Sequence, residues 1–231
     1  MRRHGFTLVE LLVVIAIIGI LLAVMAPTVG KMHERLNVDV CASQLHQLSI
    51  AQLQFAADRE GSFATPGGWV RSTGNWPHDW HDVAGQLVVR GDLFPYVKRP
   101  EVYICPTFLQ VYKPPGCGCA TAVPIFSYAM NYNLGSPETT SGWCQQGLTK
   151  VQHVSEPGAM LLMTEENSWL ISGRSSYPIN NGLFVPPARD IMGTYHFPPS
   201  GQVNEGGANT LFVDGHVAVH FWWEGPKLCR Q

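Results

Sequence analysis

The segment from Trp76 to Asp82 holds the densest group of side chains that could do chemistry. Two histidines with two aspartates form a donor set that a transition metal accepts, and they are His78, Asp79, His81 and Asp82. The alternative, which we favour, is a solvated surface loop with exposed tryptophans. Exposed indole rings would stack on sugar rings, and the candidates are Trp69, Trp76 and Trp80. We therefore expect no metal here.

Acidic and histidine side chains near the C-terminus are a second candidate group. Asp190, Glu205 and Asp214 are the acidic candidates for a calcium site, but the ligand spacing of a calcium loop is absent. His216 and His220 share one face of a predicted strand close to Asp214. We interpret these two histidines as exposed strand residues.

The sequence contains no recognisable catalytic group. Nucleophile-elbow, P-loop and zinc-protease motifs are missing, and the adjacent Glu165 and Glu166 should point to opposite faces of a strand. We expect neither an enzyme nor a cofactor. The 15 basic and 17 acidic side chains form no basic patch, which argues against nucleic acid as a partner.

Glu10 is a carboxylate inside an otherwise apolar N-terminal run. The leader MRRHG is followed by 21 residues, Phe6 to Ala26, and the 16 residues after Glu10 include no charged or amide side chain. As a helix the run is about 31 Å long, enough to span a bilayer. A carboxylate at mid-bilayer costs about 2.5–3.5 kcal/mol, so Glu10 needs a partner.

The junction between leader and apolar run resembles the processing site of type IV pilins and of type II secretion pseudopilins. The matching residues are Gly5, Phe6, Thr7, Leu8, Val9 and Glu10. The resemblance implies cleavage after Gly5 by a prepilin peptidase and N-methylation of the new terminus on Phe6. It also implies that Glu10 is unpaired in a lone subunit and meets a neighbour's terminal amine in the filament.

Two other interpretations of the N-terminus are open. A secretory signal peptide also has a basic start and an apolar run, and Val24-Met25-Ala26 would suit its peptidase. Glu10 and the length of the run disfavour this interpretation. A plain membrane anchor explains the length, but neither Glu10 nor the junction between Gly5 and Phe6.

One long helix is predicted from about Thr7 to Arg59, with a kink at Pro27. In its second half apolar residues recur at steps of three and four, as in an amphipathic helix; they are Val38, Cys41, Leu45, Leu48, Ala51 or Gln52, and Phe55. Glu60-Gly61-Ser62 should end the helix. The expected division is a leader at 1–5, a membrane or filament-core helix at 6–30 and a head at 31–231.

The expected fold class is α+β, with the long helix packed on an antiparallel sheet and long loops. The candidate strands are EVYIC ending at Cys105, Phe126–Leu134, Ala159–Glu165 and Leu183–Val185. Gly61–Asp92 is interpreted as a surface loop. Asp214-Gly215 predicts a hairpin with a two-residue type I′ turn, between Thr210–Val213 and His216–Phe221.

The six cysteines are disulfide candidates, because disulfides persist outside the cytoplasm. They are Cys41, Cys105, Cys117, Cys119, Cys144 and Cys229, and six cysteines allow 15 pairings. Cys41 lies on the inward stripe and Cys105 ends the strand expected to cover it, so we predict this disulfide. Cys117 and Cys119 would each pair with Cys144 or Cys229. No Cys-x-x-Cys spacing indicates zinc.

Further motifs resemble a large pilin-like family abundant in planctomycetes and their relatives. They are Cys41, Leu45 and Leu48 in the helix, Cys105-Pro106, Ser127-Tyr128-Ala129-Met130-Asn131, Gly207-Ala208-Asn209 and Asp214-Gly215-His216. This family usually has a histidine ten residues before the aspartate of Asp-Gly-His. Here that position is Asn204, and the nearest upstream histidine is His196.

The expected function is a structural subunit of a type IV pilus-like or type II secretion pseudopilus filament. The chain would be a single-pass inner-membrane protein with a periplasmic head, and would reach the pseudopilus or cell surface on assembly. Its expected partners are copies of itself, other pilin-like subunits, the prepilin peptidase, the inner membrane and secreted cargo. The alternative is a membrane-anchored, adhesin-like module that binds polysaccharide.

Overall fold

The computed structural model describes residues 7–71, 87–112, 124–136, 147–169, 171, 181–185, 190–198, 201–221, 223–224 and 228 of the 231-residue chain. The chain divides into two compact units, Met1–Leu36 and Asn37–Gln231. Helix α1 (Leu8–Asp58) begins in the first unit and ends in the second.

The described part of the first unit belongs almost entirely to α1. Residues Leu8–Met25 have a mean hydropathy of 3.1 and none of them is buried. By length and composition this segment can cross a membrane. As predicted, α1 continues through Pro27.

The second unit, Asn37–Gln231, makes up most of the predicted head and is called the head below. In it, one face of α1 is buried. All residues of the predicted stripe are at most 8% exposed; they are Val38, Cys41, Leu45, Leu48, Ala51, Gln52 and Phe55. After Asp58, Glu60 and Gly61 take left-handed φ values of 55° and 81°, and Gly61 N donates to Ala56 O at 2.8 Å. This terminus is of the kind that glycine favours, and it lies within one residue of the prediction.

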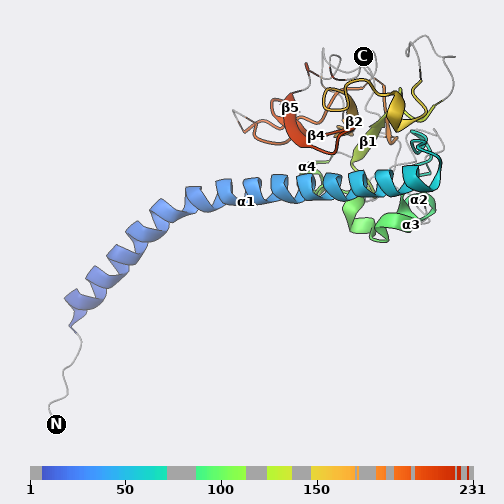
Figure 1. Cartoon of the computed structure of the whole chain (residues 1–231). Helices are drawn as coiled ribbons and strands as arrows, with labels where there is room; N and C mark the ends of the chain where they lie inside the picture. Colours follow the sequence, from blue (N-terminus) through green and yellow to red (C-terminus); the bar gives the residue numbers. More distant parts are fainter. Residues whose placement is uncertain are drawn as a thin grey trace, which may run out of the picture. The chain divides into compact units, whose positions relative to one another are not determined.

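The head contains a five-stranded sheet with the order β3-β1-β2-β4-β5 (Figure 1). The strands are β1 (Tyr128–Asn131), β2 (Leu161–Glu165), β3 (Leu183–Phe184), β4 (Gly207–Phe212) and β5 (Val217–Phe221). Neighbours are antiparallel except β1 and β3, which are parallel. The predicted α+β class is confirmed, and each predicted segment that forms β1, β2 or β3 contains the observed strand.

Helix α1 lies between the sheet and the short helix α3 (Phe94–Val97) (Figure 1). On the sheet side, the Tyr128 hydroxyl donates to Gln44 Oε1 at 2.7 Å. On the α3 side, the Tyr96 hydroxyl donates to Asp58 Oδ2 at 2.8 Å. The second half of α1 is thus covered by its own chain on two sides.

The predicted strand ending at Cys105 is wrong, because two prolines start helices there. Short helices fill this region: α2 (Leu87–Arg90), α3, the 3₁₀ helix η2 (Pro100–Tyr103) and α4 (Pro106–Val111); a second 3₁₀ helix, η3 (Val151–His153), follows β1. Pro100 and Pro106 occupy first helical positions, where a missing N–H costs nothing. Ile104 and Cys105, between these two helices, are extended. Cys105 precedes Pro106, and a residue before a proline favours an extended backbone.

The β4–β5 hairpin is present, but the predicted two-residue turn is wrong. Phe212 N donates to His216 O at 3.0 Å, which leaves Val213, Asp214 and Gly215 as a three-residue loop. Within this loop only Gly215 has a positive φ, 92°. This is the pattern of a type I turn followed by one left-handed residue.

Trp69 lies in the core, so the expectation that it is exposed is wrong. Its side chain is fully buried, its Nε1 donates to Gly182 O at 2.8 Å, and its ring stacks on Tyr103 at 5.8 Å. An indole can be buried once its N–H finds an acceptor. The interpretation of Gly61–Asp92 as a surface loop fails at this residue, while residues 72–86, with Trp76, Trp80 and the His-Asp segment, lie outside the described residues.

Candidate functional site

Glu10 is hydrogen-bonded within its own chain. Its Oε2 accepts from Thr7 N and from Thr7 Oγ1, both at 2.8 Å, and Glu10 N donates to Thr7 Oγ1 at 3.3 Å. These reciprocal bonds form a capping box at the start of α1. The Thr-x-x-Glu spacing thus gives Glu10 local hydrogen-bond partners without an opposite charge, and the expected pairing with a neighbour's terminal amine stays a prediction. The predicted processing residues Gly5 and Phe6 lie outside the described residues.

The segment of α1 that contains Glu10, Leu8–Met25, is apolar on all sides. Its large apolar side chains are 44–79% exposed, and they are Leu8, Val9, Leu11, Leu12, Val13, Val14, Ile15, Ile17, Ile18, Ile20, Leu21, Leu22, Val24 and Met25. A helix that is hydrophobic all round is stable only when other apolar groups cover it. This surface suits a bilayer or the interior of a helical assembly.

Apolar side chains also lie on the solvent side of α1 in the head. Val40, Ile50 and Leu53 are 47%, 56% and 52% exposed. They belong to the same helix as the buried stripe but point away from it. The head therefore offers apolar contact area along α1 that its own chain does not cover.

The predicted disulfide between Cys41 and Cys105 is present. It joins α1 to the residue before α4, its two Cα atoms are 5.2 Å apart, and its sequence separation is 64. Both cysteines are fully buried. The other four candidates, Cys117, Cys119, Cys144 and Cys229, lie outside the described residues.

The motif Ser127-Tyr128-Ala129-Met130-Asn131 connects the disulfide region to the sheet. Ser127 Oγ accepts from Cys105 N at 2.8 Å, and Asn131 Nδ2 donates to Leu161 O at 2.8 Å. With the Tyr128 bond to Gln44, this one strand contacts α1, the start of α4 and β2.

Next to the disulfide, His196 and Glu165 form a buried pair. His196 Nε2 lies 2.8 Å from Glu165 Oε1 and 3.5 Å from Cys105 Sγ, and both side chains are fully buried. The other carboxylate oxygen of Glu165 accepts from Asn209 N at 2.7 Å. Sequence reasoning did not predict this pair, although a glutamate at the end of the buried strand β2 signals a buried partner.

Glu165 and Glu166 point to different neighbours, as predicted. Burial, then the negative charge and hydrogen bond of Asp190, raise the pKa of Glu166 well above its usual value. Asp190 Oδ2 accepts from Val185 N at 2.7 Å. Burial and Asp190 thus favour the neutral form of Glu166.

The three calcium candidates do not come together in the structure. Among the described residues, the one group of three or more potential ligands is Cys41, Cys105, Glu165 and His196. Asn204, at the position where the resembling family has histidine, accepts from Trp169 Nε1 at 2.8 Å. Asn204 is thus part of the core's hydrogen bonding.

The hairpin histidines lie beside Phe212. His216 stacks on the Phe212 ring at 4.2 Å, and His220 meets it edge-on at 5.5 Å. His216 is exposed, as expected, whereas His220 is only partly exposed. Slight burial raises the pKa of Asp214, but hydrogen bonds from the His216 backbone and ring outweigh it, so that this pKa lies below its usual value.

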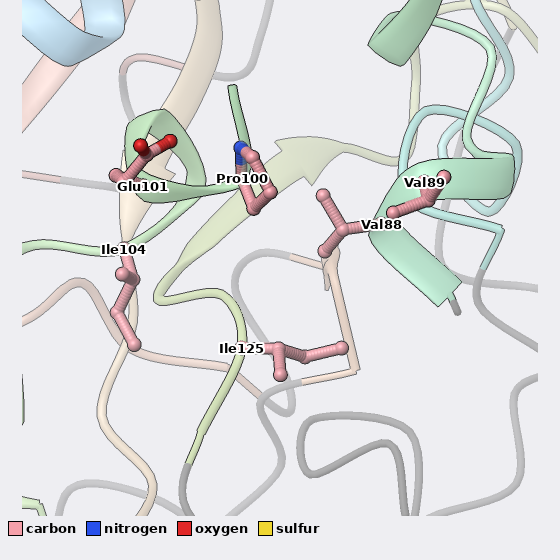
Figure 2. A pocket seen from close by; sticks show the side chains of 6 residues that line it. All are labelled: Val88, Val89, Pro100, Glu101, Ile104 and Ile125. Carbon is pink, nitrogen blue, oxygen red and sulfur yellow. The ribbon is translucent and has the colours of Figure 1, made fainter. Parts of the chain in front are cut away.

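An apolar pocket of about 250 Å³ opens on the head (Figure 2). It is lined by Val88, Val89, Pro100, Glu101, Ile104 and Ile125. Glu101 carries its one charged group, and Glu101 is exposed. A single exposed carboxylate does not fix a ligand's orientation, so this pocket does not define a binding site.

Comparison with known proteins agrees with the N-terminal motif. Residues 1–26 match the family described as the prokaryotic N-terminal methylation motif. The chain is also similar to the type IV major pilin protein PilA of Myxococcus xanthus, with 40% identity over 76 residues, 32% of this chain and 34% of that protein. The chain thus spans about a third of the length of this curated relative. No solved structure matches the chain.

Proposed function

We propose that this chain is a filament subunit of the type IV pilin kind, anchored in the inner membrane before it assembles. One observation carries the proposal: the methylation motif leads directly into a helix whose apolar side chains are exposed on every side. The similarity to a major pilin supports it. In this proposal residues 1–5 are the leader, 6–30 the membrane or filament-core helix and 31–231 the head.

The proposal includes a defined maturation. A prepilin peptidase cleaves after Gly5, and the new amino group on Phe6 is methylated. The mature chain then begins four residues before Glu10, which lies in the first turn of α1. Removing the leader also removes Arg2 and Arg3, so the mature head and helix carry 13 basic against 17 acidic side chains.

Assembly exchanges the partner of Glu10. In the single chain, the carboxylate is held by Thr7 through neutral donors. In a dry filament core, a charge without an opposite charge is costly, whereas an ion pair is tolerated. A neighbouring subunit's terminal amine supplies that opposite charge. Exposed side chains such as Leu12 and Ile50 provide the apolar contacts of the same assembly.

The test compares Glu10→Ala and Glu10→Val with Asp39→Ala, which removes an exposed carboxylate from the same helix. Mass spectrometry should find a mature N-terminus at methylated Phe6 in all three variants. Both Glu10 variants should reduce recovery in the sheared or purified filament fraction by about tenfold or more, equivalent to about 1.4 kcal/mol. Asp39→Ala should assemble like the parent chain.

Two results would contradict this proposal. A mature protein that starts at Pro27, or retains Met1, would exclude the proposed processing. Filament assembly by both Glu10 variants at the parental level would exclude the charge exchange. Recovery from the cell surface by shearing distinguishes a pilus from a periplasmic secretion pseudopilus.

The polysaccharide-binding alternative loses one of its three aromatic candidates. Trp69 is buried and cannot stack on a sugar. Its other two candidates, Trp76 and Trp80, lie outside the described residues.

A further inference from the structure

Four side chains with metal-binding atoms converge in the core of the head. Cys41 comes from α1, Cys105 precedes α4, Glu165 ends β2, and His196 pairs with Gly207 beside β4. One potential ligand atom from each lies within 4.8 Å of the others. All four residues are fully buried. Their convergence is independent of whether the chain forms filaments.

One distance between these atoms matches a tetrahedral zinc site, and the others would lengthen on binding. With Zn–S near 2.3 Å and Zn–N near 2.05 Å, neighbouring sulfur and nitrogen ligands are about 3.6 Å apart. Cys105 Sγ and His196 Nε2 are 3.5 Å apart. The Glu165 oxygen, now 2.8 Å from this nitrogen, would have to move to about 3.4 Å. The sulfurs, bonded in this structure, would separate to about 3.8 Å.

The ring of His196 presents the correct nitrogen. Nε2 faces the sulfur of Cys105 and the carboxylate of Glu165, whereas Nδ1 is buried and has no hydrogen-bond partner among the described residues. A metal on Nε2 would leave the ring proton on Nδ1, and this proton has no acceptor among the described residues. The position of Nε2, and not the state of Nδ1, is therefore what favours a metal.

The charge and the type of the four ligands indicate which metal ion fits. Two thiolates and one carboxylate carry three negative charges, and a divalent ion leaves a net charge of −1 with neutral His196. Without the ion, a reduced core would bury thiols against a carboxylate whose donors, among the described residues, are His196 and Asn209 N. Thiolate and imidazole ligands select zinc over magnesium or calcium.

We propose that, when the Cys41–Cys105 disulfide is reduced, Cys41, Cys105, Glu165 and His196 bind one zinc ion. A dithiol reductant supplies two electrons and two protons, becomes a disulfide itself, and leaves two thiols. Zinc then displaces the two thiol protons. All four positions are filled by protein, as in structural zinc sites. In a newly made, still reduced chain, zinc would join α1 to the sheet, as the disulfide does in this structure.

The first test uses the natural full-length chain in detergent, reduced with a phosphine and then freed of metal. The chain is alkylated with and without one equivalent of zinc and mapped by mass spectrometry. Zinc should protect Cys41 and Cys105 and leave the other cysteines labelled. Equal labelling of Cys41 and Cys105 with and without zinc would overturn the proposal.

The second test uses cobalt as a spectroscopic probe, in a background with Cys117, Cys119, Cys144 and Cys229 changed to Ser. The reduced chain should bind one equivalent with the visible bands of tetrahedral thiolate-bound cobalt, and zinc should abolish them. The oxidised chain should show none. Absence of these bands in the reduced chain, or equal bands in the oxidised chain, would refute the site.

Ligand variants in the same background assign the other two positions. His196→Gln and Glu165→Gln should each weaken cobalt binding by about 100-fold or more, because even partners outside the ligand shell contribute about 10–100-fold. His220→Gln, on β5, is the matched control and should bind like the background. Circular dichroism establishes that each variant is folded. A folded His196→Gln variant with unchanged affinity and spectrum would show that the metal lies elsewhere.

Discussion

The two halves of α1 form one continuous helix but differ in how their side chains are buried. From Leu8 to Met25, no residue is buried, and apolar side chains cover every side. From Val38 to Phe55, a single stripe is buried by the head, and Gln44 hydrogen-bonds Tyr128 on the sheet. The second half has a buried stripe that its own chain covers, although Val40, Ile50 and Leu53 stay exposed. The first half has no buried residue and needs lipid or other subunits. Substitutions in the two halves should therefore affect different measurements.

The stability of the head and the assembly of filaments can be measured separately. The earliest of the seven tryptophans is Trp69, so all of them follow α1 in the sequence. Denaturant unfolding of the detergent-solubilised chain, followed by this fluorescence, reports on the head. Filament recovery reports on assembly.

The largest expected effect comes from cutting the link between α1 and the rest of the head. Cys41→Ala with Cys105→Ala should lower the free energy of unfolding by about 4 kcal/mol, since the bond closes a loop of 64 residues. The measurement is urea unfolding under oxidising conditions. The parent chain without reductant is the control. A loss below about 1 kcal/mol would mean that packing alone holds α1 to the head.

A cavity in the stripe should have an effect of similar size. Leu45→Ala should cost about 2–5 kcal/mol, because the Leu45 side chain is fully buried. Leu53→Ala is the matched control on the same helix; Leu53 is 52% exposed, and its loss should be within about 0.5 kcal/mol. Equal losses for the two variants would contradict the assigned face of α1.

Removing one hydrogen bond between α1 and β1 should lower the free energy of unfolding by less than the two changes above. Tyr128→Phe removes the donor to Gln44, and should cost about 1 kcal/mol in urea unfolding at neutral pH. Burial and the charge of Glu165 raise the pKa of Tyr128 well above 10. The folded chain thus holds this proton more tightly than the unfolded chain, whose tyrosines titrate near pH 10.

The sign of the pH dependence follows from this difference. The stabilising contribution of Tyr128 is complete below pH 10 and is lost as pH rises towards its pKa in the folded chain. The parent chain should therefore lose stability above pH 10 more steeply than Tyr128→Phe. Tyr195, whose pKa is also raised by burial, should keep part of the slope in the variant. Identical slopes would show that Tyr128 ionises freely in the folded chain.

Periodic patterns in the sequence predicted the features that depend on one element. The stripe from Val38 to Phe55, the ends of α1 and the apolar strand β2 follow from local spacing. The disulfide was predictable because the stripe fixed where Cys41 points. It was correct even though the element assigned to Cys105 was wrong, because residue 105 is extended before Pro106 in either case.

Features that depend on several distant segments were not predictable from local patterns. Glu165 and His196 are 31 residues apart and meet only because β2 lies beside β4. Trp69 Nε1 finds its acceptor at Gly182 O, which is 113 residues away. Thr7 and Glu10, in contrast, show a capping-box spacing that the sequence contained. The resemblance drew attention to the intermolecular role of Glu10 and away from this local one.

The smallest expected effect is the most direct test of the comparison between the two halves. Leu12→Ala is the same substitution as Leu45→Ala, made on the same helix, at a side chain that is 56% exposed. Alanine and leucine are both strong helix formers, so α1 itself should be little affected. The free energy of unfolding should change by less than about 0.5 kcal/mol, because this side chain is exposed and no residue of Leu8–Met25 is buried. Filament recovery should nevertheless fall, since apolar contact area is lost in the assembly.

A loss above about 1 kcal/mol in the fluorescence-detected unfolding would mean that the first half of α1 also contributes to the fold of the head. Unchanged unfolding with reduced filament recovery would instead separate the two halves as the structure does, one for folding and one for association.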